Sequence, residues 1–160
     1  MSVITKNATT TLVNAAFLQE VKESNFDLWN LLQAMRDVIV HEDPPREETT
    51  AWVSKLSELR DALGLEFSLE ETYGYVDGPN CLPNSHSTDA CIAKSQHKEL
   101  YLQLHEICEQ AEEAQYRGTI ARDMPIYMGA FEQFDENFRA HELFEHRLID
   151  GTMGQSYFSG

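Results

Sequence analysis

The sequence predicts an all-α protein, an up-down-up-down antiparallel four-helix bundle that spans residues 14–150. Four long segments carry apolar residues at alternating spacings of three and four, and almost no segment alternates as a strand would. The connections between these segments are short or medium, which favours antiparallel neighbours. A chain of 160 residues makes one domain with a real core. Residues 1–13 are predicted to be disordered, and residues 151–160 to form a C-terminal tail.

The first two predicted helices meet at a pair of prolines, Pro44 and Pro45. The first helix covers about residues 14–40, and the second covers about 46–75 with Asp43 as its N-cap. The stripe that should face the core of the first helix is Leu18, Val21, Asn25, Leu28, Leu32, Met35 and Ile39. The stripe of the second helix is Trp52, Leu56, Leu59, Leu63, Glu66, Glu70 and Tyr73.

The last two predicted helices follow a loop rich in turn residues that begins at Asp77. The third helix covers about residues 88–118, with the stripe His97, Tyr101, Leu104, Cys108 and Ala111. The fourth begins near Pro125, with Asp123 as its cap, and ends before Gly151. Its stripe is Phe131, Phe134, Phe138, His141, Glu145 and Leu148.

Charge and composition exclude several classes of function. The chain has 12 basic and 27 acidic residues, a net charge of −15, which repels phosphate backbones and anionic lipid. We therefore expect no nucleic-acid partner and no membrane partner. No apolar run is long enough for a membrane span, and no signal peptide is recognisable. Three cysteines do not make a disulfide framework, so a cytoplasmic location is expected, and the oligomeric state stays open.

Polar side chains interrupt every one of the four apolar stripes. They occupy positions in register with the leucines and phenylalanines, where a bundle should be apolar. In the predicted topology they all fall about 7–15 Å from the same end of the bundle. These residues are Asn25, Glu66, Glu70, His97, Tyr101, His141 and Glu145.

Buried carboxylates at this level need a positive charge beside them, because removing a lone carboxylate from water is costly. No Lys or Arg is expected on the stripes. Carboxylates and imidazoles together suit iron, manganese or zinc. The spacing of four between Glu66 and Glu70, repeated between His141 and Glu145, places paired ligands on one helical face. A metal-free network of shared protons and imidazolium ions is the alternative.

Three stretches resemble the hemerythrin-like (HHE cation-binding) domain family, over about residues 17–150. They are LEFSLEETYGY (65–75), QHKELY (96–101) and AHELFE (140–145). Four residues match the metal-binding pattern of that family: Glu70, His97, His141 and Glu145. Asn25 and Glu66 stand where the family has His, and Tyr101 stands where it can have a further ligand. The resemblance implies a pair of non-haem iron ions in the core of the bundle.

The predicted function is therefore a metal-binding protein that binds or senses iron, O₂ or oxidants, and no catalytic residues are assigned. The predicted ligands are Glu66, Glu70, His97, His141 and Glu145, with Asn25 and Tyr101 completing the pocket. One or two non-haem iron ions are expected, or none if the site is vestigial. Glu71 is a candidate acceptor for a ligating His, whereas Glu142 and His146 are placed at the surface or in a second layer. The alternatives are a metal-free interaction module and a di-iron oxidase.

Overall fold

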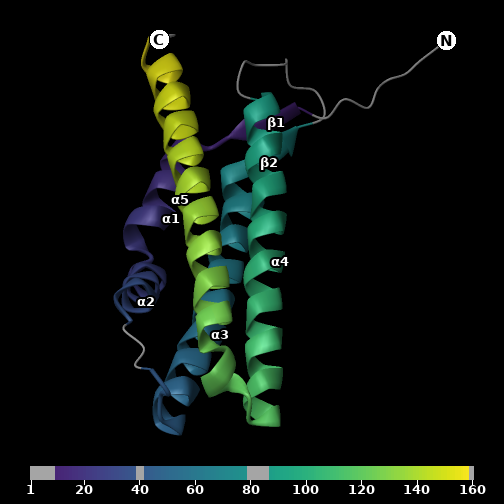
Figure 1. The fold of residues 1–160 in the computed structure, drawn as a ribbon. Helices are drawn as coiled ribbons and strands as arrows, with labels where there is room; N and C mark the ends of the chain where they lie inside the picture. The colour runs from purple at the N-terminus through teal and green to yellow at the C-terminus, as the bar shows by residue number, and fades with distance from the viewer. Residues whose placement is uncertain (1–9, 39–41, 79–86, 159–160) are drawn as a thin grey trace, which may run out of the picture. The chain divides into compact units, whose positions relative to one another are not determined.

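A computed structural model describes residues 10–38, 42–78 and 87–158. The elements are β1 (Thr10–Val13), α1 (Ala15–Ser24), α2 (Phe26–Asp37), α3 (Arg46–Leu69), the π-helical turn η1 (Glu70–Gly74), β2 (Tyr75–Gly78), α4 (Ser87–Arg117) and α5 (Ile120–Phe158) (Figure 1). The all-α prediction is confirmed at this level, because helices hold most of the described residues. Within these ranges, no helix is both long enough and apolar enough to span a bilayer.

Two of the predicted helices end earlier than expected. The predicted helix over 14–40 is divided at Asn25, whose side-chain Oδ1 accepts a hydrogen bond from the backbone N–H of Leu28 at 3.3 Å. Asn25 is thus the N-cap of α2, a role that Asn fills well. The predicted helix over 46–75 is α-helical only to Leu69, then continues as η1 and becomes a strand at Tyr75.

The predicted ends of the domain are also corrected. Residues 10–13 form β1 instead of belonging to a disordered segment, and residues 1–9 lie outside the described residues. Helix α5 begins at Ile120, before Pro125, and continues past Gly151 to Phe158, so the predicted tail over 151–160 is largely helical. A Gly inside a helix costs only about 1 kcal/mol relative to Ala, which is too little to end a helix by itself.

The chain divides into two compact units. The first unit contains residues 1–24, 66–97 and 140–160, and the second contains residues 25–65 and 98–139. Helices α3, α4 and α5 each contribute to both units, whereas α1 belongs to the first and α2 to the second.

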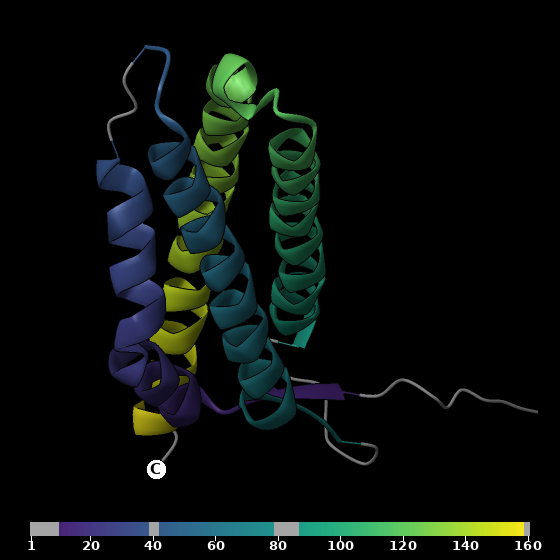
Figure 2. The same cartoon turned by 90° about the horizontal axis from the view of Figure 1, so that it is seen from below.

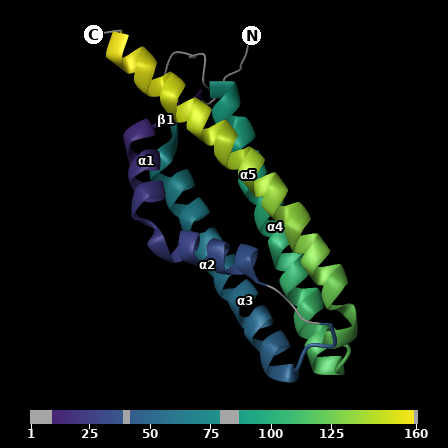
Figure 3. The same ribbon diagram turned by 60° about the vertical axis from the view of Figure 1, so that its left-hand side comes forward.

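The second unit has a core of leucine and phenylalanine side chains. Within it, α4 and α5 form an antiparallel hairpin that turns at Gly118, which has a φ of 76° (Figure 2 and Figure 3). Arg36 of α2 makes a two-pronged ion pair with Asp135 of α5 through hydrogen bonds of 2.8–3.0 Å. The largest fully buried side chains here are Phe134, Phe138, Leu28, Leu32, Leu56, Leu59, Leu63, Leu104 and Met124.

The first unit joins distant parts of the chain around a small apolar core. Strands β1 and β2 pair antiparallel, with Thr10 opposite Gly78 and Val13 opposite Tyr75. The backbone N–H of Asn14 donates to the carbonyl of Gly74 at 2.7 Å, which ties the start of α1 to the end of η1. The core contains Ala15, Leu18, Tyr75, Ala90, Ala93, Leu148 and Ile149. This packing holds α1, η1, α4 and α5 together around the polar residues described below.

The contact between Gly74 and Leu18 predicts a steric requirement for glycine. A Cβ atom at position 74 would stand 2.8 Å from Cγ of Leu18, which is fully buried and has little room to move. We expect Gly74→Ala to lower the free energy of unfolding by about 1–3 kcal/mol, measured by urea denaturation. Gly129→Ala is the control, because among the described residues no atom outside the adjoining turns of its own helix lies within 4 Å of the added Cβ. A loss in Gly74→Ala no larger than that of the control would contradict the prediction.

Candidate metal centre

The five residues predicted as metal ligands all belong to the first unit, and all are buried. None of the five is more than 2% exposed. They come from three parts of the chain, namely the end of α3 with η1, the first third of α4, and the second half of α5. The residues are Glu66, Glu70, His97, His141 and Glu145.

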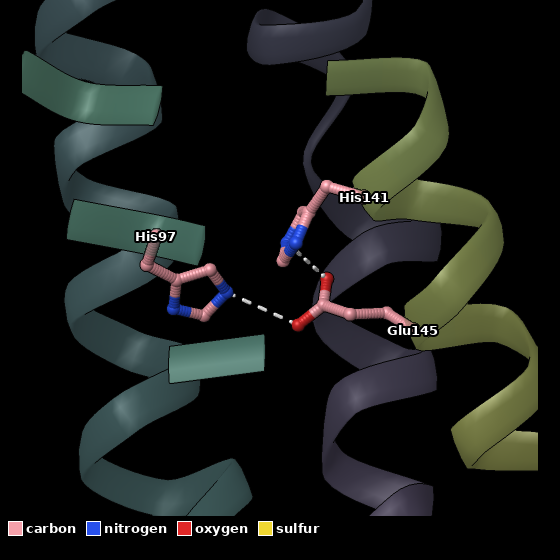
Figure 4. A group of neighbouring side chains, drawn as sticks. All are labelled: His97, His141 and Glu145. Carbon is pink, nitrogen blue, oxygen red and sulfur yellow. Dashed lines mark hydrogen bonds and ion pairs between the residues drawn. The ribbon is translucent and has the colours of Figure 1, made fainter. Parts of the chain in front are cut away.

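Glu145 lies between the two histidines. Its Oε2 is 3.1 Å from Nε2 of His97, and its Oε1 is 3.0 Å from Nε2 of His141 (Figure 4). One ligand atom from each of these three residues lies within 4.8 Å of the others. Neighbouring ligands on one ion with bonds of about 2.1 Å stand about 3 Å apart, which is the distance from each histidine nitrogen to Glu145.

Each histidine is oriented by a hydrogen bond from its other ring nitrogen. Nδ1 of His97 donates to Oε2 of Glu71 at 3.0 Å, and Nδ1 of His141 donates to Oε1 of Gln96 at 2.7 Å. With Nδ1 protonated in this way, each Nε2 is directed at Glu145. A metal-bound His normally has this arrangement of its two nitrogens. The predicted role of Glu71 as an acceptor is thus confirmed. The sequence does not predict the same role for Gln96, and its only indication there is that Gln96 precedes His97.

The π-helical turn η1 brings two consecutive glutamates to one imidazole. Oε1 of Glu70 lies 3.1 Å from Nε2 of His97, while Glu71 takes the hydrogen bond from Nδ1. An α-helix points consecutive side chains about 100° apart, whereas the wider π turn changes these directions.

Phe67 stacks on the His97 ring with 4.0 Å between the ring centroids, so this face of the ring is apolar. Polar groups therefore reach His97 through its nitrogens.

Lys22 of α1 lies among the carboxylates, which corrects the expectation that no cation would join the stripes. Its Nζ is 2.7 Å from Oε1 of Glu145, 2.9 Å from Oε2 of Glu142 and 3.1 Å from Oε2 of Glu70. Because α1 ends at Ser24, its buried face is set by Ala15, Leu18, Val21 and Lys22. Glu142 is buried beside Lys22, whereas His146 is exposed as expected.

Tyr75 of β2 is a further member of the cluster that sequence reasoning missed. Its hydroxyl donates a hydrogen bond of 2.7 Å to Oε2 of Glu145, and its side chain is almost fully buried. Burial and the negative charge of Glu145 raise the pKa of Tyr75, so the phenol stays neutral and acts as a donor. The sequence predicts Tyr75 at the end of a helix, whereas it lies in β2, opposite Val13 of β1.

The charges in the cluster stabilise one another. Burial alone would lower the pKa of His97, but the facing carboxylates of Glu145, Glu70 and Glu71 outweigh it and raise that pKa to about 11. Burial likewise opposes the charge of Lys22, yet Glu145, Glu70 and Glu142 raise its pKa well above the ordinary value. Burial would raise the pKa of Glu145, but His141, His97 and Lys22 hold it well below its usual range. Without metal, His97 and Lys22 are therefore cations and Glu145 is an anion.

Glu70 gives the clearest sign that the cluster accommodates a further ligand. Among the described residues, neither of its oxygens accepts a hydrogen bond of good geometry, although Lys22 and His97 stand 3.1 Å away. Its charge is therefore balanced by the two ion pairs, while its oxygens keep lone pairs that no well-aligned donor takes. A metal ion would satisfy these oxygens, because it binds a lone pair directly and needs no aligned N–H group. The donor set of carboxylates and imidazoles is one that iron, manganese and zinc accept.

The two residues predicted to complete the pocket belong to the second unit. Asn25 caps α2 as described above. Tyr101 stacks on His105 with 6.0 Å between their ring centroids, and one of its ring carbons would stand 3.0 Å from a Cβ at Gly64. The role of both residues in a metal pocket stays a prediction.

Comparison of the chain with protein-family models, with curated proteins and with solved structures finds no match. The resemblance to hemerythrin-like domains therefore stays a prediction from the three short stretches. What the structure shows is a buried group of His97, His141 and Glu145 that could hold a metal ion.

Proposed function

We propose that this protein binds a transition-metal ion through His97, His141 and Glu145, with Glu70 beside them, in a hemerythrin-like antiparallel four-helix bundle. One observation supports the metal site most strongly. Both histidines direct Nε2 at the same carboxylate while Nδ1 donates to another acceptor. Glu66 is a further candidate ligand, because it is fully buried one helical turn before Glu70.

Iron is the proposed metal, and the proposed role is the binding or sensing of iron, O₂ or oxidants. Two imidazoles with one carboxylate are typical of non-haem Fe²⁺ sites that keep open coordination positions. Bound Fe²⁺ would supply a position for O₂ or an oxidant. The chain itself contributes neutral nitrogens from His97 and His141, one negative charge from Glu145, and the Tyr75 hydroxyl that orients this carboxylate.

A metal-free bundle that acts as an interaction module is the second candidate. The observation that favours it is Lys22, whose ammonium neutralises buried carboxylates without any metal. In that case the acidic surface, with a net charge of −15, would contact a basic partner.

Metal content decides between these two functions. Untagged protein is expressed with added iron, purified anaerobically without chelator, and its metal is counted by mass spectrometry. We expect stoichiometric metal in the wild type and far less in His141→Ala. Removal of a ligand should lower the metal affinity at least as much as removal of its supporting group, about tenfold or more.

His146→Ala is the matched control for this experiment. His146 lies on the same helix, five residues further on, but it is exposed, so this variant should keep its metal. Trace metal in the wild type, unchanged by His141→Ala, would reject the metal site and favour the interaction module.

A further inference from the structure

Two carboxylates in the cluster face two positive positions at once. Glu70 is 3.1 Å from Lys22 through Oε2 and 3.1 Å from His97 through Oε1. Glu145 is 2.7 Å from Lys22 through Oε1 and 3.1 Å from His97 through Oε2. Both glutamates therefore bridge the Lys22 ammonium and the position that Nε2 of His97 faces. Carboxylates that bridge two metal ions share their oxygens in the same way.

We propose that this site holds a single metal ion and that the ammonium group of Lys22 occupies the place of a second cation. This inference rests on the proposed function, since it concerns the same site. The metal belongs where Nε2 of His97 and Nε2 of His141 converge on Glu145. The lysine lies against Oε2 of Glu70 and against Oε1 of Glu145, the oxygen that also faces His141.

The surroundings of Lys22 fit an ammonium and exclude a metal from its position. An ammonium has three N–H donors and no lone pair, so it cannot itself ligate a metal. Three carboxylates, those of Glu70, Glu142 and Glu145, lie within 3.1 Å of Nζ. The side chain of Lys22 is only 5% exposed, so its charge has little water to rely on and depends on these carboxylates.

A fixed cation at this position has two consequences for the site. It holds Glu70 and Glu145 in place before a metal binds, so binding the ion costs less side-chain conformational entropy. It also repels a second divalent ion, which would stand among the same carboxylates. The lysine thus sets the number of metal ions at one.

Mn²⁺ is the probe for this inference, because it binds the same kinds of ligand and its magnetic resonance spectrum separates single ions from coupled pairs. The full chain is stripped with EDTA, dialysed and titrated with Mn²⁺. We expect one Mn²⁺ per chain in the wild type, with the spectrum of an isolated ion. Lys22→Ala removes the ammonium and leaves space among three carboxylates, so we expect two ions per chain and an exchange-coupled spectrum.

Two control variants accompany Lys22→Ala. Lys22→Arg keeps a cation at the position and should bind one ion. Lys98→Ala removes an exposed lysine of α4 and should also bind one ion.

Each outcome decides the question. Two ions in the wild type, or one ion in a folded Lys22→Ala, would overturn the inference but leave metal binding intact. If Lys22→Ala does not fold, Lys22→Met, which keeps a side chain of similar length without the charge, is titrated in its place and is held to the same expectation of two ions. A wild type that takes up no Mn²⁺ and no iron would overturn the proposed function and this inference with it.

Discussion

Glu145→Gln is expected to lower the free energy of unfolding of the metal-free protein by about 3–5 kcal/mol. The carboxylate of Glu145 contacts the Lys22 ammonium at 2.7 Å and Nε2 of His97 at 3.1 Å. Both groups are buried cations when no metal is bound, and a neutral amide of the same shape removes one of the two carboxylates that they share, leaving Glu70 alone between them. Removing one partner of a buried ion pair costs far more than the pair itself contributes, because the remaining charge stays out of water.

Urea denaturation in the presence of EDTA, followed by circular dichroism, measures this loss. Glu109→Gln is the control, because the side chain of Glu109 is 66% exposed and its ion-pair partner, His105, is itself partly exposed. Exposed pairs of this kind contribute less than about 1 kcal/mol. If Glu145→Gln were as stable as Glu109→Gln, the charges of Lys22 and His97 would not depend on Glu145, and the described electrostatics would be wrong.

The positions of His97, His141 and Glu145 could be predicted because each lies in register with apolar residues on a long regular helix. Periodicity identifies such positions without knowledge of the partner helix. Glu70 was found in the same way, although it lies in a π turn, because the four-residue step from Glu66 is still α-helical. The sequence therefore identified the acidic and imidazole side chains that gather in the first unit.

The sequence does not place Lys22 in the cluster, because the predicted first helix runs through Asn25. In one continuous helix to residue 40, the apolar residues align best along a stripe that passes through Val21 and Asn25. Lys22 then lies beside this stripe, outside the predicted core. Once Asn25 is taken as a cap, α1 is short, and Lys22 at four residues after Leu18 falls on the buried face. An Asn followed by Asp27 in the first turn is a recognisable helix start.

Tyr75 and the π turn depend on contacts between distant segments, which local patterns do not contain. The strand that includes Tyr75 forms because residues 10–13 pair with residues 75–78. The backbone bond from Asn14 to Gly74 adds to this closure. Four-residue strands joined across more than sixty positions leave almost no periodic signal in either segment.

The metal-free protein is expected to lose stability as the pH rises from 7 to 8.5. The pKa of His97 is raised to about 11 in the folded state, compared with 6.5 in an unfolded chain. The folded state therefore binds this proton more tightly, so the stabilisation is complete below pH 6.5 and declines as the pH rises towards 11. The decline is at most about 1.4 kcal/mol per pH unit, since one proton is involved.

The loss of stability between pH 7 and 8.5 can be assigned to His97 only if its neighbours do not titrate in the same range. Glu70 and Glu71 of η1 and Glu145 of α5 face its nitrogens, and Tyr75 of β2 and His141 of α5 lie against its ring. The pKa of Glu145 is held below its usual range, and the pKa of Tyr75 is raised, so neither titrates between pH 7 and 8.5 in the folded state. The range also ends below the ordinary pKa of Tyr in an unfolded chain, about 10.

Thermal melting in EDTA at pH 7 and 8.5 tests this prediction, with His97→Gln as the control. Gln keeps a polar side chain at the position but has no proton to lose, so its melting temperature should change less over the same range. The metal-loaded wild type should also change less, because Nε2 of His97 carries no proton when it binds a metal. The stabilisation by metal therefore grows with pH, as it does wherever a metal ion and a proton compete for one nitrogen. A metal-free wild type as stable at pH 8.5 as at pH 7 would show that His97 is neutral and that its carboxylate neighbours are compensated by Lys22 alone.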